Sequence, residues 1–157
     1  MLETYTVSFF GHRRLEEFFT LESDLENLVR NLIREKEYVE FLVGRDGDFD
    51  QLVASTVKRC KRNIRSDNSS LIWVAPYSTA ELRNNEKALK EYYDEIEICE
   101  YSAQSHFKSS FQIRNRSMVD RSDLVVFCVE RKAGGAYQTM RYAEKRGVSY
   151  INLLEIK

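Results

Sequence analysis

Short apolar runs alternate along this chain with longer segments in which apolar residues recur every three or four positions. The short runs, rich in β-branched and aromatic residues, predict strands, and the longer spacing predicts helices that bury one face. The predicted strands cover residues 5–10, 38–43, 71–75, 96–98, 124–129 and 148–153. The predicted helices cover about 20–36, 48–64, 86–93, 105–121 and 136–146.

Strands and helices alternate over almost the whole length, which is the pattern of βαβ units. Because crossover helices cover both faces of a parallel sheet, we predict an α/β fold with three layers, α/β/α, around a mostly parallel sheet of about six strands. Ile96 and Ile98 alternate with glutamates, which places their strand nearer an edge. A chain of 157 residues without internal repeats or linkers fits one domain spanning 1–157.

The stretch from residue 124 to 135 is the most informative part of the sequence. Residues 124–129 form an unbroken apolar run, typical of a strand buried on both faces. A polar turn with Gly134 and Gly135 follows, and then a predicted helix begins. A helix N-terminus offers unpaired N–H groups and a positive dipole end, and glycine lets a phosphate come close. The sequence therefore predicts an anion-binding turn here.

Two more glycine turns follow predicted strands, one at Gly11 and one at Gly44 with Gly47. In open parallel sheets, ligands bind beyond the carboxyl ends of the strands, where the strand order reverses. If the first strand and the strand 124–129 are neighbours, the three turns form one rim. We therefore expect one ligand site built from three segments that are far apart in the sequence.

The first turn places His12 and Arg13 directly after Gly11. Arg13 is suited to a forked contact with a phosphate or carboxylate, and a tight turn with solvated side chains is an equally good interpretation. His12 has the chemistry of a general acid or base, but a lone histidine is more often a hydrogen-bonded structural residue.

The second turn and the start of the helix after it hold three carboxylates within residues 44–50. Asp48 suits the N-cap position of that helix. Asp50 is then free to hold a ribose hydroxyl or an attacking water, although it also complements the positive end of the helix dipole. The spacing is not that of a calcium loop.

The helix before residue 124 carries Arg114 and Asn115, and Met118 lies one turn further on the same face as Arg114. An arginine and a thioether on one face could hold a phosphate and pack against a base. The alternative interpretation is an exposed cluster of charged residues.

Composition narrows the classes of partner. The chain has 24 basic and 25 acidic residues and a net charge of −1. This balance argues against dependence on a broad positive surface, so we expect nucleic acid to be an unlikely partner. No apolar run approaches the ~20 residues needed to cross a membrane, and the first residues lack the pattern of a secretory signal.

The cysteines Cys60, Cys99 and Cys128 are odd in number, far apart and without the spacing of a zinc site. Free thiols in a reducing compartment are the simplest interpretation. We therefore expect a cytoplasmic protein with no bound metal and no resident cofactor.

Four stretches together resemble the SLOG superfamily of LOG/DprA-like proteins, and within it the small bacterial branch that starts with FxGHR. The stretches are residues 9–13, 44–50 and 114–123, and the pair Gly134-Gly135 with Thr139. The resemblance implies a Rossmann-like fold that binds nucleotides or their derivatives on the glycine turns. The expected ligand-binding residues are Gly11, His12, Arg13, Gly44, Gly47, Asp50, Arg114, Asn115, Met118, Gly134, Gly135 and Thr139.

The resemblance to LOG enzymes also suggests a reaction, because these enzymes release the base from a nucleotide with an arginine and a glutamate. Arg114 matches the arginine, but Tyr142 stands where the glutamate is expected, and the segment 134–139 is one residue longer than the family's glycine motif. A tyrosine stabilises the positive charge that develops on the ribose poorly at neutral pH. Hydrolysis would therefore need Arg114 and a relocated carboxylate, Asp50 or Asp120.

Three functions follow from these patterns. The first is a cytoplasmic binding or sensor domain for a nucleoside monophosphate, ADP-ribose or an NAD-like ligand, with phosphate on the glycine turns and arginines. The alternative is a nucleoside 5′-monophosphate phosphoribohydrolase of LOG type. Single-stranded DNA binding fits the net charge poorly. Dimers are common among LOG relatives, so a homodimer is a possible state by analogy.

Overall fold

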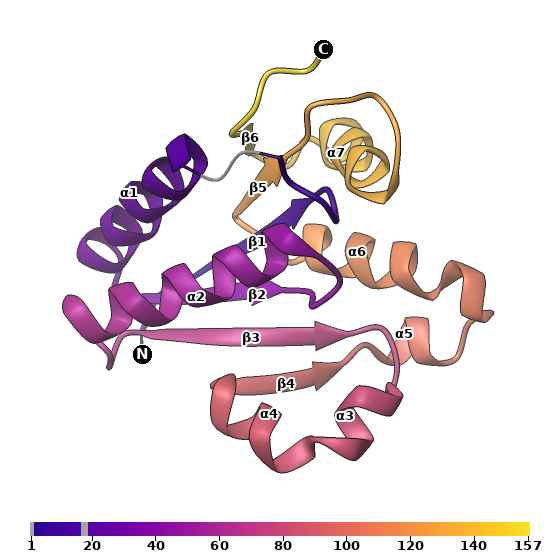
Figure 1. The fold of residues 1–157 in the computed structure, drawn as a ribbon, viewed down its shortest axis with the longest axis horizontal. Helices are drawn as coiled ribbons and strands as arrows, with labels where there is room; N and C mark the ends of the chain where they lie inside the picture. Colours follow the sequence, from indigo (N-terminus) through magenta and orange to yellow (C-terminus); the bar gives the residue numbers. More distant parts are fainter. Residues whose placement is uncertain (1, 17–18) are drawn as a thin grey trace.

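A parallel sheet of six strands forms the centre of the computed structural model, which describes residues 2–16 and 19–157 (Figure 1). The strands lie in the order β4-β3-β2-β1-β5-β6, and every neighbouring pair is parallel. Their bounds are β1 (Thr4–Gly11), β2 (Tyr38–Val43), β3 (Ser69–Ala75), β4 (Glu95–Ile98), β5 (Leu124–Cys128) and β6 (Tyr150–Asn152).

Helices cover both faces of this sheet. The bounds of the helices are α1 (Phe19–Glu35), α2 (Asp48–Asn63), α3 (Ala80–Asn84), α4 (Glu86–Tyr92), α5 (Glu100–Ala103), the 3₁₀ turn η1 (Phe107–Ser109), α6 (Ser110–Asp120) and α7 (Gly135–Arg146). Helices α1 and α2 share one apolar core with the sheet, and α6 and α7 share the other. The predicted three-layer α/β fold is confirmed.

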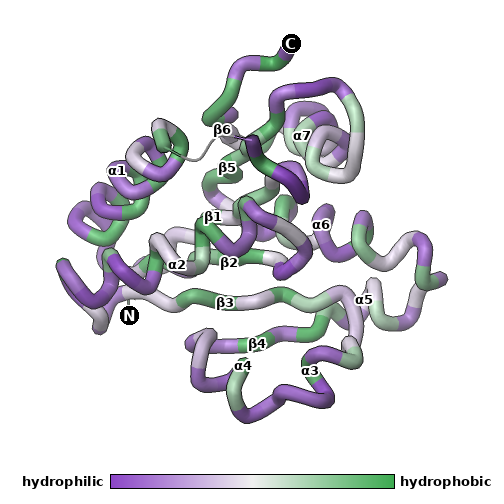
Figure 2. Tube along the Cα trace, in the orientation of Figure 1, coloured by the Kyte–Doolittle hydropathy of each residue, from purple (hydrophilic) through white to green (hydrophobic). Residues whose placement is uncertain are grey.

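Alternation along each strand divides the core between the two faces. In β1, Phe9 faces the core under α1 and α2, and its neighbour Phe10 faces the core under α6 and α7. In β5, Val126 and Phe127 divide in the same way. Because both faces are covered, the central strands bury apolar residues on both sides, with the buried Ser8 of β1 as a polar exception, whereas the helices alternate hydrophobic and hydrophilic residues (Figure 2).

The strand order reverses beside β1, and this position determines where a ligand can enter. The chain moves outward from β1 through β2 and β3 to β4, and then crosses back to β5 on the other side of β1. Gly11, the last residue of β1, pairs with Cys128, the last residue of β5. The turns after these two strands therefore diverge to opposite faces of the sheet and leave a crevice between them.

Two of the predicted helices differ in the structure, because local capping interactions determine where the helices begin. Residues 77–94, which gave one predicted helix, form the two short helices α3 and α4. The Thr79 hydroxyl accepts a hydrogen bond from the Leu82 N–H and so begins α3. The predicted helix 105–121 begins as the 3₁₀ turn η1, where His106 Nδ1 accepts from the Lys108 N–H.

The cysteines of the described chain are free and buried, and no cluster of three or more histidine, cysteine or acidic residues among the described residues could hold a metal ion. Within residues 2–16 and 19–157, no helix combines the length and the apolar character that crossing a lipid bilayer requires.

Gly11 allows α2 to pack directly against the end of β1, which predicts a large effect of adding one methyl group. A Cβ at Gly11 would lie 2.5 Å from two ring carbons of Phe49, which is fully buried. We expect Gly11→Ala to lower the free energy of unfolding by about 1–3 kcal/mol, measured by urea denaturation.

The control for this change is Gly135→Ala, where the nearest atom to the new methyl is the flexible Gln112 Nε2 at 3.3 Å. That variant should stay close to the parent protein in stability. An equal loss in the two variants would contradict the assignment of the Gly11 effect to the Phe49 contact.

Candidate functional site

A cavity of about 370 Å³ opens at the carboxyl edge of the sheet, in the crevice beside β1. All three glycine turns contribute to it, together with the first half of α6. The structure therefore brings together segments that are separated by more than one hundred residues in the chain. The lining residues are Phe10, Gly11, His12, Arg13, Gly44, Asp46, Gly47, Asp50, Phe111, Gln112, Arg114, Asn115, Arg131, Gly134, Gly135 and Ala136.

Hydrogen bonds hold the first turn against the second. The Asp48 N–H donates to the Arg13 carbonyl at 2.8 Å, and the Asp48 carboxylate accepts from the Leu15 N–H at 3.0 Å. The interpretation of Asp48 as the N-cap of α2 is wrong, because the N-cap residue is Gly47 and no side chain caps this end. Asp48 instead fixes the loop that carries Arg13.

His12 holds the first turn against the third. Its backbone N–H donates to the Cys128 carbonyl at 3.2 Å, and its Nε2 accepts from the Glu130 N–H at 3.1 Å. Burial, and then the charge of Arg131, lower the pKa of His12. A neutral ring whose Nε2 accepts carries its proton on Nδ1. The sequence allows two roles for His12, a general acid or base and a hydrogen-bonded structural residue. These contacts favour the structural role.

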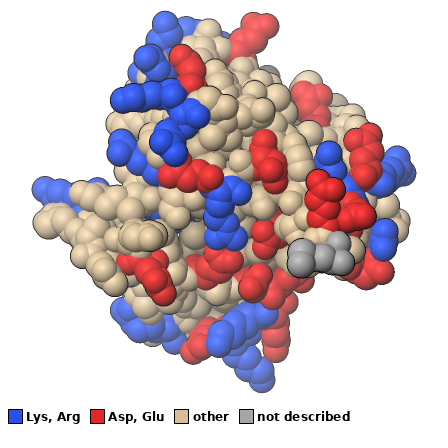
Figure 3. All heavy atoms as spheres, turned by 180° about the vertical axis from the view of Figure 1, so that it is seen from behind, with Lys and Arg blue, Asp and Glu red and all other residues tan. Residues whose placement is uncertain are grey.

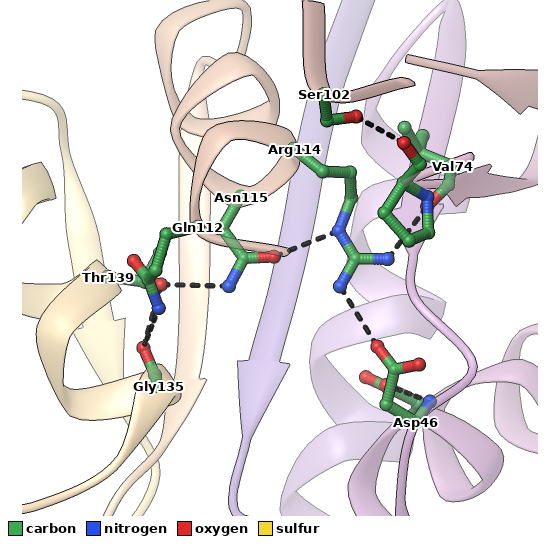
Figure 4. Close-up of polar contacts among 10 residues, drawn as sticks. Asp46, Val74, Ser102, Gln112, Arg114, Asn115, Gly135 and Thr139 are labelled. Atoms are coloured by element: carbon green, nitrogen blue, oxygen red, sulfur yellow. Dashed lines mark hydrogen bonds and ion pairs between the residues drawn. The ribbon is translucent and has the colours of Figure 1, made fainter. Parts of the chain in front are cut away.

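Arg114 connects α6 to the opposite wall of the cavity (Figure 4). Its side chain is only 4 % exposed, and its guanidinium donates three hydrogen bonds. The acceptors are the Val74 carbonyl at 2.8 Å, the Asp46 carboxylate at 2.9 Å and the Asn115 side-chain oxygen at 2.9 Å. The alternative of an exposed charge at this position is wrong. Most donors of this arginine bind the protein itself, although the side chain also lines the cavity.

A second chain of polar contacts runs from α6 to α7 (Figure 4). The Asn115 amide donates to the Thr139 hydroxyl at 3.0 Å, and that hydroxyl donates to the Gly135 carbonyl at 2.9 Å. Gln112 also donates to the Gly135 carbonyl, at 3.2 Å. Thr139 is fully buried beneath the first turn of α7, so it positions this turn from below and does not line the cavity.

Met118, expected to pack against a base, lies instead in the core between the sheet and the helices α6 and α7. It is 1 % exposed and outside the cavity lining. The other expected residues, Asn115 among them, line the cavity. The spacing of four residues correctly places Met118 and Arg114 on one side of the helix, but the sheet rather than a ligand covers the thioether.

Asp50 is a half-buried carboxyl group in the cavity wall. Its Oδ2 accepts a hydrogen bond from the Asp46 N–H at 2.9 Å. Burial raises the pKa of Asp50 to about 6, because the low-dielectric surroundings disfavour the charged form more than the Asp46 N–H and the nearby arginines favour it. Of the two carboxylates proposed to replace the LOG glutamate, Asp50 is the one that faces the cavity.

Asp120 and Tyr142 lie away from this cavity, on the outer side of α6 and α7. The Tyr142 hydroxyl donates to the Asp120 carboxylate at 2.8 Å, and Arg146 pairs with the same carboxylate at 3.3 Å. Tyr142 lines a separate hollow whose cationic side chains are Arg116, Arg141, Lys145 and Arg146. Lysine and arginine side chains gather on the α7 side in the rear view, at the upper left of Figure 3. The residue at the position of the LOG glutamate therefore does not reach the candidate site.

The N-terminus of α7 is the part of the wall best prepared for an anion. Gly134, at φ +93°, turns the chain into the helix, and no side chain caps this end. The N–H groups of the first turn therefore lack intrahelical partners beside the cavity. Arg13 and Arg131 are exposed and line the same cavity. Arg131 was missed from the sequence because it precedes the glycines in a polar turn without periodicity.

The three bonds of Arg114 predict a structural penalty when the side chain is removed. Truncation leaves Asp46 without its cation and the buried Val74 carbonyl without its donor. We expect Arg114→Ala to lose about 3–5 kcal/mol in the free energy of unfolding, measured by urea denaturation. The control is Arg116→Ala on the exposed side of the same helix, which should change stability by no more than about 0.5 kcal/mol. Equal stability of the two variants would contradict the conclusion that Arg114 holds α6 against the opposite wall of the cavity.

Because the pKa of Asp50 is raised, we expect that replacing its carboxylate by a neutral amide increases the stability of the fold, by an amount that depends on pH. The unfolded chain releases the Asp50 proton near the ordinary pKa of 3.8, and the folded chain near 6. The contribution of Asp50 to stability therefore falls as the pH rises from about 4 to about 6. We expect Asp50→Asn to match the parent at pH 4 and to exceed it by up to about 3 kcal/mol above pH 6.5.

Unfolding free energies at several pH values, compared with those of the exposed-site variant Asp120→Asn, would measure this gain. A difference that does not grow between pH 4 and 6.5 would contradict the raised pKa.

Comparisons with known proteins give the fold but no family. No protein-family profile and no curated protein matches the sequence at a significant level. The chain is similar to DNA processing protein A of Helicobacter pylori, with a TM-score of 0.67 and 20% identity over 96% of this chain and 66% of that one. It is also similar to DprA of Streptococcus pneumoniae, with a TM-score of 0.69 and 17% identity over 94% of this chain and 50% of that one.

These comparisons correct one expectation about partners. The Helicobacter protein is described by its mode of single-stranded DNA binding, which overturns the expectation that nucleic acid is an unlikely partner. The physical reason is that net charge is a sum over the surface and does not report local clusters such as Arg13 and Arg131 in the cavity wall. The chain spans between half and two thirds of these solved chains. It has the Rossmann-like α/β fold of the DprA proteins.

Proposed function

We propose that this protein is a binding or sensor domain for a nucleotide-derived ligand whose phosphate lies at the N-terminus of α7. The observation that carries the proposal is the uncapped first turn of α7, entered through Gly134, which opens into a cavity shared by all three glycine turns. Backbone N–H groups and the helix dipole favour a phosphate there. The candidate ligands are nucleoside monophosphates, ADP-ribose and NAD-like molecules.

Two exposed arginines supply the charge that completes such a site. Arg13 and Arg131 reach the cavity from the turns after β1 and β5, on the two sides of the crevice. Neither forms a salt bridge among the described residues. Arg114 adds a fixed positive charge from below, although Asp46 neutralises part of it. Arginine is suited to this role because its planar fork matches the geometry of phosphate oxygens.

The dimensions of the cavity favour a small molecule. A volume of about 370 Å³ lies at the lower end of the roughly 300–1,000 Å³ of small-molecule sites. Phe111 gives the wall an apolar surface beside the charged groups. The site therefore accommodates a phosphate and a sugar inside the cavity.

Single-stranded DNA binding is the second candidate, and the likeness to the Helicobacter DprA structure favours it. A DNA strand offers the same phosphate to α7 and its arginines, but it also continues beyond the cavity along the surface. Its affinity would therefore fall steeply with salt, because each neutralised phosphate releases counterions. A free nucleotide makes far fewer such contacts.

Phosphate binding by the arginines can be tested with ribose 5-phosphate as the probe. We expect calorimetry to detect binding to the parent protein, and Arg13→Ala and Arg131→Ala each to weaken it by roughly tenfold, the cost of about one charge-assisted hydrogen bond. Arg14→Ala is the matched control, because Arg14 is exposed beside Arg13 but outside the cavity lining.

Three further measurements distinguish the candidate ligands. A ligand at one hundred times its dissociation constant should stabilise the fold by ~2.7 kcal/mol, which thermal-shift screening of AMP, ADP-ribose and NAD detects. Fluorescence anisotropy with a labelled oligo-dT at two salt concentrations tests the DNA candidate. Chromatography of an AMP incubation tests for release of free adenine. The absence of binding to every phosphate-bearing probe would contradict the proposed function.

A further inference from the structure

The cavity wall contains two carboxylates, Asp46 and Asp50, beside the groups proposed to hold phosphate. A carboxylate repels a phosphate, so each of them needs a positive or hydrogen-bond-donating partner. Asp46 has such a partner in the Arg114 guanidinium, 2.9 Å away. Asp50 forms no salt bridge among the described residues, and its partner is a single backbone N–H.

The two oxygens of Asp50 differ in their contacts. Oδ2 accepts from the Asp46 N–H at 2.9 Å, whereas Oδ1 has no hydrogen-bond donor within residues 2–16 and 19–157. Oδ1 is not among the buried side-chain atoms that lack a partner in the described chain, so it is open to the cavity. A ligand that fills the cavity displaces water from Oδ1 and must supply a donor in its place, because an unpaired buried acceptor costs free energy.

The placement of Asp50 in the fold indicates which part of a nucleotide brings that hydroxyl. The proposed phosphate site lies at the start of α7, which follows β5, and Asp50 lies in the first turn of α2, which follows β2. Strand β1 separates β5 from β2, so the cavity extends from the phosphate site across the end of β1 to Asp50. This is the direction in which the cavity has room for a sugar attached to the phosphate. In many dinucleotide sites of parallel α/β sheets, an acidic side chain after the second strand accepts from the ribose.

We propose that Asp50 Oδ1 accepts a hydrogen bond from the 2-hydroxyl of the sugar, so that the site selects ribose over 2-deoxyribose. This inference rests on the proposed function, because it needs the phosphate at α7 to orient the sugar. A deoxy ligand leaves the carboxylate unpartnered inside a filled cavity, and sites built around a hydroxyl reject analogues that lack it. The ligand class that this contact favours is a phosphate-bearing molecule with a ribose.

The test compares two probes that share a phosphate and lack a base, ribose 5-phosphate and 2-deoxyribose 5-phosphate. Calorimetry at pH 7.5 should show at least tenfold tighter binding of ribose 5-phosphate, as expected for a hydrogen bond to a charged group. Asp50→Ala removes the side-chain acceptors and should bind the two probes within about twofold of each other, through a loss for ribose 5-phosphate alone. In Asp50→Asn the amide oxygen can keep the Asp46 N–H, and its NH2 group can donate to the sugar hydroxyl, so this variant should keep part of the preference without the negative charge.

Asp120→Asn is the matched control, because it removes the same charge from the outer side of α6 and should keep the full preference for ribose. Equal binding of the two probes by the parent protein, or an unchanged preference in both Asp50 variants, would overturn the sugar selection and leave phosphate binding intact. Failure of both probes to bind the parent protein would instead remove the proposed function, and this inference with it.

Discussion

The burial of one charged side chain, Arg114, holds the walls of the candidate site together. Its guanidinium leaves water almost completely, and such a burial is tolerated only when the charge and the N–H groups find partners. The partners come from different elements: β3 through Val74, the turn after β2 through Asp46, and α6 itself through Asn115. The arginine therefore fixes the distance between α6 and the opposite side of the cavity.

Hydrogen bonds between polar side chains and backbone groups also join the other turns around the cavity. Asn115 passes the connection through Thr139 to the first turn of α7, and His12 joins the turns after β1 and β5. Asp48 joins the turns after β1 and β2. The sequence predicts that His12, Asn115 and Thr139 bind a ligand, but their side chains already form hydrogen bonds to other parts of the cavity wall. Among the described residues, the α7 N–H groups, Arg13 and Arg131 line the cavity without an ion-pair partner and are placed to meet an anion.

The likeness to the two DprA structures, at 20% sequence identity or less, is a likeness of the fold alone. The crevice is a consequence of parallel strands whose connections leave to opposite faces, and many ligand classes can use it. The cavity wall of this chain contains a pair of carboxylates, Asp46 and Asp50, which a site for phosphate alone does not require.

The sequence alone determined the fold class and the long elements, but not the short helices α3 and α5, because apolar runs and helical spacing record buried faces only over longer segments. It also indicated the site, since glycines after strands must lie at the carboxyl edge of a parallel sheet. It could not decide which polar residues face a ligand. Met118 and Thr139 have the right spacing, but the core covers them, and Asp120 is a surface residue.

Only the tertiary structure decided these assignments, because a hydrogen-bond partner such as Val74 for Arg114 lies 40 residues away and leaves no local pattern. The exposure of Arg131 and the free Oδ1 of Asp50 follow from the same long-range packing. Local sequence determines backbone preference and the periodicity of burial. The hydrogen-bond partners of a polar side chain depend instead on neighbours that the fold brings from elsewhere in the chain.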